Sequence, residues 1–195
     1  MAAMLAAGCG GPSWQDFTVQ DGGFRVLMRG EVHYDKRELD TPAGKIVAHM
    51  YSIEFKDSVF GVGYSDYPPQ MVQSMTPRRL FMAVRDTWVR RIEGRLEGDG
   101  TDIRLDKQHP GMEIVAWGKV KGRNAYLKGR FYLVGDRLYQ IVIFGNRDSM
   151  PLADINHFLA SFKLVPQREV GSVIVTPPPV KPRVPMPLES LKPKQ

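Results

Sequence analysis

Ser65 lies in a short motif that begins like the site of a nucleophilic serine. In Gly63-Tyr64-Ser65-Asp66-Tyr67 the first glycine and the serine are spaced as in the sharp turn that exposes such a serine in hydrolases. That turn also needs a glycine where Tyr67 stands, and a helix directly after it, and the sequence offers neither. We therefore expect Ser65 to be a polar strand residue and predict no catalytic residue. An enzyme, for example a hydrolase, whose site no motif reveals is the alternative.

Four histidines and one acidic loop are the other groups that could bind an ion. No two histidines are four residues apart, and none lies at ligand spacing from the single cysteine, so we expect no zinc site. The acidic loop has too few alternating oxygen ligands for calcium and is expected to be a solvated turn. The sequence thus predicts no metal and no cofactor. The residues considered are His33, His49, His109 and His157, with Glu97, Asp99 and Asp102 in the loop.

Cys9 has the most specific setting of any residue in the sequence. It follows Leu5-Ala6-Ala7-Gly8 and precedes Gly10-Gly11-Pro12. Small residues before a cysteine and a flexible spacer after it resemble the end of a bacterial lipoprotein signal. We therefore expect residues 1–13 to be a signal remnant and linker, with Cys9 as the lipidation site and a membrane reached through that lipid.

The signal is incomplete. A secretory signal needs a basic region and an apolar run of about 7–15 residues before its processing site. Only eight residues precede Cys9, none of them basic, and Ala6 stands where a lipoprotein signal has a large aliphatic residue. A start codon farther upstream would explain this. The alternative is a frayed, alanine-rich N-terminus with an incidental cysteine.

The charge distribution does not indicate nucleic-acid binding. The net charge is +6, but five basic and two acidic residues lie from Val165 onward, so this segment supplies half of it. In the rest of the chain, lysines and arginines are interspersed with acidic residues, whereas a nucleic-acid site needs clustered positive charge. We expect an unknown protein partner or small ligand and no nucleic acid.

The spacing of apolar residues predicts strands and helices that form one domain over residues 14–165. Period-two alternation predicts strands at 14–19, 24–28, 45–55 and 58–67, with a loop before the third, and again at 102–106, 112–119, 125–134 and 137–144. Period 3.6 predicts a helix after Thr76-Pro77 with Trp88 on its apolar stripe, and another after Pro151 with Leu152 on its stripe. Strands and segregated helices in this order indicate an α+β fold.

Two further segments allow more than one interpretation. The arginines of the first predicted helix could bind lipid headgroups, but at helical spacing they are expected to form its solvated face. Residues 166–195 are proline-rich and lack a periodic apolar face, so we expect a disordered tail or stalk. Docking of Pro177-Pro178-Pro179-Val180-Lys181-Pro182-Arg183 in an aromatic groove is the alternative.

The sequence resembles the PsbP-like superfamily, which includes photosystem accessory proteins, DcrB-like bacterial lipoproteins and a nuclear Ran-binding protein. The resemblance covers Trp14 to Leu164 and depends on Trp14-Gln15-Asp16-Phe17-Thr18-Val19, Gly23-Phe24-Arg25-Val26, the central amphipathic helix, Tyr139-Gln140-Ile141-Val142 and Phe158-Leu159-Ala160-Ser161-Phe162-Lys163-Leu164. It implies an α+β fold with a mostly antiparallel sheet of about seven to eight strands and two main helices packed on it. Because members of one fold perform unrelated functions, it implies no site residue.

Together these features predict a non-enzymatic accessory or binding domain. Its expected location is the bacterial cell envelope, as a membrane-anchored lipoprotein. A cytoplasmic protein-binding adaptor is the alternative if the cysteine is incidental.

Overall fold

The computed structural model describes residues 13–41, 44–120 and 122–166. Cys9 and nearly all of the proline-rich segment lie outside these residues. Within the described ranges, no helix is both long and apolar enough to cross a bilayer.

An antiparallel sheet of eight strands forms the centre of the domain. The strand order is β3-β4-β5-β10-β9-β8-β6, and β7 also pairs with β8. This confirms the predicted α+β fold. The strands are β3 (His33–Thr41), β4 (Gly44–Phe55), β5 (Ser58–Asp66), β6 (Arg95–Leu96), β7 (Thr101–Leu105), β8 (His109–Val120), β9 (Arg123–Val134) and β10 (Arg137–Gly145).

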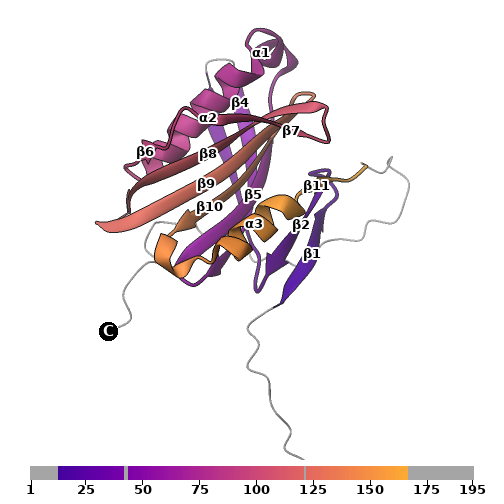
Figure 1. The fold of residues 1–195 in the computed structure, drawn as a ribbon. Helices are drawn as coiled ribbons and strands as arrows, with labels where there is room; N and C mark the ends of the chain where they lie inside the picture. The colour runs from indigo at the N-terminus through magenta and orange to yellow at the C-terminus, as the bar shows by residue number, and fades with distance from the viewer. Residues whose placement is uncertain (1–12, 42–43, 121, 167–195) are drawn as a thin grey trace, which may run out of the picture.

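A smaller three-stranded sheet and the helices cover the two faces of the large sheet. Figure 1 shows α3 and the small sheet on one side and α2 on the other. Each side encloses its own cluster of buried apolar residues, so the large sheet is the middle of three layers. The remaining elements are β1 (Trp14–Val19), β2 (Phe24–Arg29), β11 (Lys163–Leu164), α1 (Pro69–Gln73), α2 (Pro77–Arg91), the 3-10 turn η1 (Arg147–Ser149) and α3 (Leu152–Ser161).

Helix α2 begins where its sequence predicts. The Thr76 side chain accepts a hydrogen bond from the Arg79 backbone N–H, and Pro77 occupies the first turn, where its missing N–H costs nothing. Trp88 is 7% exposed and its indole N–H donates to Gln140 Oε1 at 2.9 Å, which joins the helix to β10. The predicted packing of the Trp88 stripe on the sheet is therefore confirmed.

The structure corrects the prediction for two arginines of α2. Arg85 was expected on the solvated face, yet it is 8% exposed, donates to Asp86 and to the Asp99 carbonyl, and is thus buried with partners. Arg91 was expected to point away from Trp88, but its guanidinium lies 4.9 Å from the centre of the Trp88 ring. Aromatic rings attract cations to their faces, which the helical period alone does not reveal.

Several elements differ from the sequence prediction. Residues predicted as a loop before Pro42 form the edge strand β3. Its many charged residues leave no visible alternation of apolar and polar side chains, and they also protect the sheet edge from pairing with another strand. The first hairpin pairs with β11 in a separate sheet instead of joining the large one. Leu152, expected in the buried stripe of α3, is 55% exposed because it stands at the helix start, outside the packed turns.

Gly63 shows the close backbone approach that its position in a strand suggests. A Cβ atom at this residue would lie 2.5 Å from the His49 carbonyl oxygen on β4. A side chain here would therefore force β4 and β5 apart.

Candidate functional site

Ser65 lies inside the protein. It is 1% exposed on β5, between Ala48 of β4 and Leu138 of β10. No substrate carbonyl can reach a hydroxyl in this position, so the structure agrees with a strand residue and does not support a nucleophile.

The histidines and the acidic loop do not come together. His33, His49, His109 and His157 lie on four different elements, and among the described residues no group of three metal-ligating side chains converges. The groups of the acidic loop bind neighbouring residues: Glu97 accepts from Trp117, the Asp99 carbonyl from Arg85, and Asp102 from Arg78. The loop therefore positions side chains of β8 and α2.

The arginines of α2 are largely engaged within the protein. Arg78 pairs with Asp102 at 2.5 Å, and Arg85 and Arg91 have the partners given above. A lipid headgroup would have to compete with these contacts at three of the five arginines of α2.

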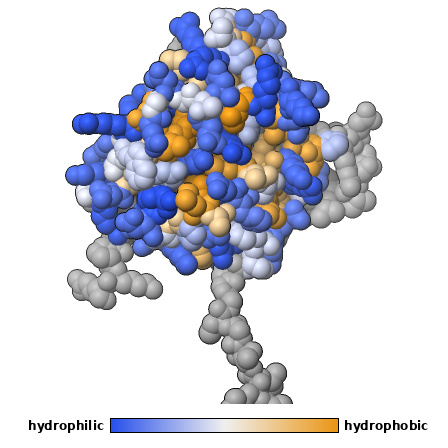
Figure 2. Space-filling model, viewed as in Figure 1, coloured by the Kyte–Doolittle hydropathy of each residue, from blue (hydrophilic) through white to orange (hydrophobic). Residues whose placement is uncertain are grey.

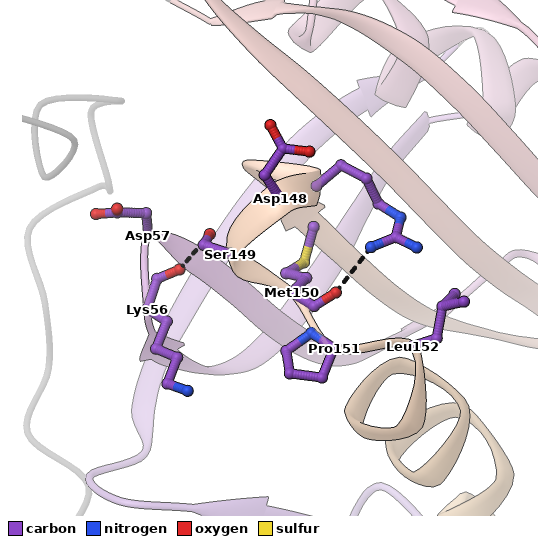
Figure 3. Close-up of a pocket in the computed structure, with 8 residues that line it drawn as sticks. Lys56, Asp57, Asp148, Ser149, Met150, Pro151 and Leu152 are labelled. Carbon is purple, nitrogen blue, oxygen red and sulfur yellow. Dashed lines mark hydrogen bonds between the residues drawn. The ribbon is translucent and has the colours of Figure 1, made fainter.

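An open pocket of about 700 Å³ lies between the β4–β5 turn and the segment before α3 (Figure 3). The Ser149 hydroxyl donates to the Lys56 carbonyl at 2.8 Å, and Arg147 donates to the Met150 carbonyl at 2.9 Å. The first bond joins the two segments, and the second lies within the segment before α3. The pocket is lined by Lys56, Asp57, Arg147, Asp148, Ser149, Met150, Pro151 and Leu152.

Trp117 is the main exposed aromatic residue on the face that bears α3. It is 47% exposed on β8, and its indole N–H donates to Glu97 Oε2 at 2.9 Å. Its ring packs edge to face against the buried Tyr126 of β9, with centroids 4.8 Å apart. We call Val115, Trp117, Tyr126, Glu97 and Arg147 the Trp117 surface.

The Trp117 surface is rigid and chemically mixed. Arg147 lies 5.7 Å from the centre of the Tyr126 ring, within reach of a cation–π interaction. Two contacts therefore hold Tyr126 and Trp117 in fixed orientations before any partner arrives. Figure 2 shows hydrophobic patches between hydrophilic side chains on the side of the molecule that it depicts. A surface of this kind can bind protein without being an aggregation site.

A charged triad borders the Trp117 surface. Glu113 on β8 accepts from Arg130 at 2.7 Å and pairs with Lys128 at 3.2 Å, both on β9. Burial alone would raise the pKa of Glu113, but its bonds to Arg130 and the charge of Lys128 lower the pKa overall. Arg130 also donates to the Leu159 carbonyl, so the triad connects the sheet with α3.

A second aromatic cluster surrounds His49 near the opposite edge of the sheet. The His49 ring stacks on Tyr64 with centroids 4.5 Å apart, and its Nδ1 atom is hydrogen-bonded to the Tyr34 hydroxyl at 2.7 Å. Arg137 lies over Tyr64 at 4.7 Å and binds both oxygens of Asp66. This layered arrangement lacks a nucleophile or a set of metal ligands, and we interpret it as a structural cluster.

We expect His49 to titrate below the usual histidine pKa of about 6.5. Burial, with smaller contributions from Lys36 and Arg137, lowers the pKa of its imidazole. A histidine pKa that is lower in the folded state means that protonation favours unfolding. The contribution of neutral His49 to the stability of the fold is therefore complete above about pH 6.5 and is lost as the pH falls through the pKa of His49 in the folded state. NMR titration of the His49 ring protons measures the midpoint, and a value at or above 6.5 contradicts the prediction.

The sequence contained a signal for Trp117 that the prediction did not use. In β8 the residues Met112, Ile114 and Ala116 face α2 and are fully buried. Val115 and Trp117 must then point to the other face. The position of this tryptophan on the face opposite α2 could therefore be inferred once the strand register was known.

Comparison with solved structures supports the fold. The solution structure of cyanobacterial PsbP (CyanoP) from Synechocystis sp. PCC 6803 matches with a TM-score of 0.53 and 13% identity, over 83% of this chain and 98% of that chain. A Pseudomonas aeruginosa crystal structure of a protein of unknown function matches with a TM-score of 0.39 and 13% identity, over 80% of this chain and 99% of that chain. No protein-family model and no curated protein matches the sequence. The match to CyanoP shows that the chain has a PsbP-like fold.

Proposed function

We propose that this protein is a non-enzymatic accessory domain of the bacterial cell envelope, held at a membrane by a lipid on Cys9, that binds a partner protein through the Trp117 surface. The observation that supports the binding role is that Trp117 is 47% exposed while its indole N–H is hydrogen-bonded to Glu97 and its ring packs against Tyr126. The setting of Cys9 in the sequence supports the envelope location.

The composition of the Trp117 surface favours protein binding. Tryptophan, tyrosine and arginine are the residues most enriched among those that dominate binding energy at protein interfaces, and all three occur here side by side. An exposed tryptophan offers a large apolar area at a low cost in side-chain entropy, because it has two rotatable bonds.

Partner capture tests the binding role. The partner is first retained on the immobilised full chain from a membrane extract, identified, purified and titrated against purified variants. Trp117→Ala should weaken its affinity by about 30-fold or more, the loss expected for a central interface residue worth about 2 kcal/mol. Met82→Ala is the matched control, because Met82 is a 39% exposed apolar residue on α2, on the opposite side of the sheet. If both variants bound the partner with equal affinity, the Trp117 surface would not be part of the binding site.

Lipidation is tested separately in a host that processes lipoproteins, with the gene expressed from its upstream start if one exists. The wild-type chain should sediment with membranes and show the mass of a diacylglyceryl group on Cys9, whereas Cys9→Ser should stay soluble. Identical fractionation and unmodified mass in both forms would reject the lipid anchor, and would leave the binding test unaffected.

A further inference from the structure

We propose that the proline-rich segment of this same chain, residues 177–187, docks on the Trp117 surface and thereby competes with the partner. This inference rests on the proposed function, since it assigns the regulation of the same surface.

The spacing of prolines in this segment suits recognition by an aromatic residue. Pro179, Pro182 and Pro185 follow one another at intervals of three. A polyproline II helix has three residues per turn, so these three rings fall on one face of such a helix. Segments with this PxxP spacing bind aromatic-lined sites at a small entropic cost, because their conformation is largely formed in advance.

The Trp117 surface offers the chemical groups that such a segment needs. The ring of Trp117 is exposed and held in place by Tyr126, and it can pack against proline rings. Its indole N–H is bonded to Glu97, which places a carboxylate next to the ring. A carboxylate in this position can pair with Lys181 or Arg183, the basic residues between the prolines.

The charges around Trp117 also suggest an orientation. Glu97 hydrogen-bonds through its backbone to Val115, on one side of Trp117 along β8, whereas Arg95 pairs with Trp117 itself and Lys119 lies on the other side. On the Val115 side, Glu97 and Glu113 balance the charges of Lys128 and Arg130. The basic residues of the segment are therefore expected there, away from Arg95 and Lys119.

The chain is long enough for this contact. Strand β11 ends at Leu164, and Pro179 is 15 residues farther along. At about 3.1 Å per residue in an extended polyproline II conformation, this connection reaches about 45 Å. Arg147 of the Trp117 surface lies just before α3 and β11 just after it. Helix α3 has 10 residues and spans about 15 Å, so the Trp117 surface is within this reach. A tethered segment also has an effective concentration on the order of millimolar, which makes a weak contact sufficient.

The indole N–H signals of the full chain test the inference without a partner. The protein has three tryptophans, and Trp117→Phe identifies the Trp117 signal by its loss. Replacing Pro179, Pro182 and Pro185 together by alanine in the full chain should shift the Trp117 signal, while those of Trp14 and the buried Trp88 stay in place. Addition of a peptide of residues 176–188 to this triple variant, up to the millimolar range, should restore the wild-type position. The same peptide with three alanines should not.

Two further measurements separate the possible outcomes. Glu97→Gln should weaken peptide binding by up to about fivefold, the range of an exposed ion pair. The Trp117 signal of the wild-type chain should not depend on protein concentration if the contact forms within one molecule. An unchanged Trp117 signal in the triple variant overturns the inference, as does a concentration-dependent one. Loss of partner binding in Trp117→Ala alongside either result leaves the proposed function intact and rejects only its regulation by the tail.

Discussion

Trp88→Ala should lower the free energy of unfolding by about 3–5 kcal/mol, a large part of the 5–15 kcal/mol typical of a domain. Trp88 is 7% exposed, its ring packs 6.1 Å from that of Phe144, and its N–H donates to Gln140. Truncation removes the ring contact of α2 with Phe144 of β10 and leaves Gln140 without this donor. For a domain of this size the loss corresponds to a drop of roughly 6–20 °C in melting temperature.

The same substitution at Trp117 provides a matched comparison. Trp117 is 47% exposed and packs against one ring, so Trp117→Ala should cost about 1 kcal/mol, the value of an aromatic pair. Arg90→Ala, on the exposed side of α2, should change the free energy of unfolding by no more than about 0.5 kcal/mol. Denaturant unfolding measures all three variants. Equal midpoints for the two tryptophan variants would mean that α2 does not hold its place through Trp88.

The sequence was sufficient to predict the elements whose residues face one apolar core. The Trp88 stripe has the helical period, and the run from Leu138 to Phe144 marks β10 as the central strand that it is. The edge strand β3 was missed because its residues face solvent or carry charge, so that no apolar alternation is visible. The separate small sheet depends on the pairing of β2 with β11, a contact over a long sequence distance that no local pattern encodes.

The candidate site was less predictable than the fold. Glu97 was evaluated as a metal ligand, whereas its role in the structure is to accept the indole N–H of Trp117. That contact brings together residues 20 positions apart and depends on the pairing of β6 with β8. Cys9 was predicted as a lipidation site from its local sequence setting, and because it lies outside the described residues it stays a prediction.

Phe24→Ala should destabilise the domain by about 3–5 kcal/mol, because it removes a fully buried ring that packs between the small sheet and the large one. The Phe24 ring is fully buried, and its centroid lies 6.1 Å from that of Tyr139 and 5.7 Å from that of Phe162. The neighbouring turn is attached to the large sheet by two more bonds, from the Tyr139 hydroxyl to the Gly22 carbonyl and from Arg137 to the Asp21 carbonyl. Ring packing and turn attachment together indicate that both sheets unfold as one unit.

Arg25→Ala is the control for this prediction, since Arg25 is the next residue of β2 and its side chain is 44% exposed beside Asp16. It should change the free energy of unfolding by at most about 0.5 kcal/mol. Denaturant unfolding combined with amide hydrogen exchange decides the matter. If the unfolding midpoint of Phe24→Ala stays at the wild-type value while only β1 and β2 lose exchange protection, the small sheet opens independently and the two sheets are not one cooperative unit. A lower midpoint with protection lost across both sheets confirms that Phe24 couples them, as expected for a ring that contacts both the large sheet and the segment after α3.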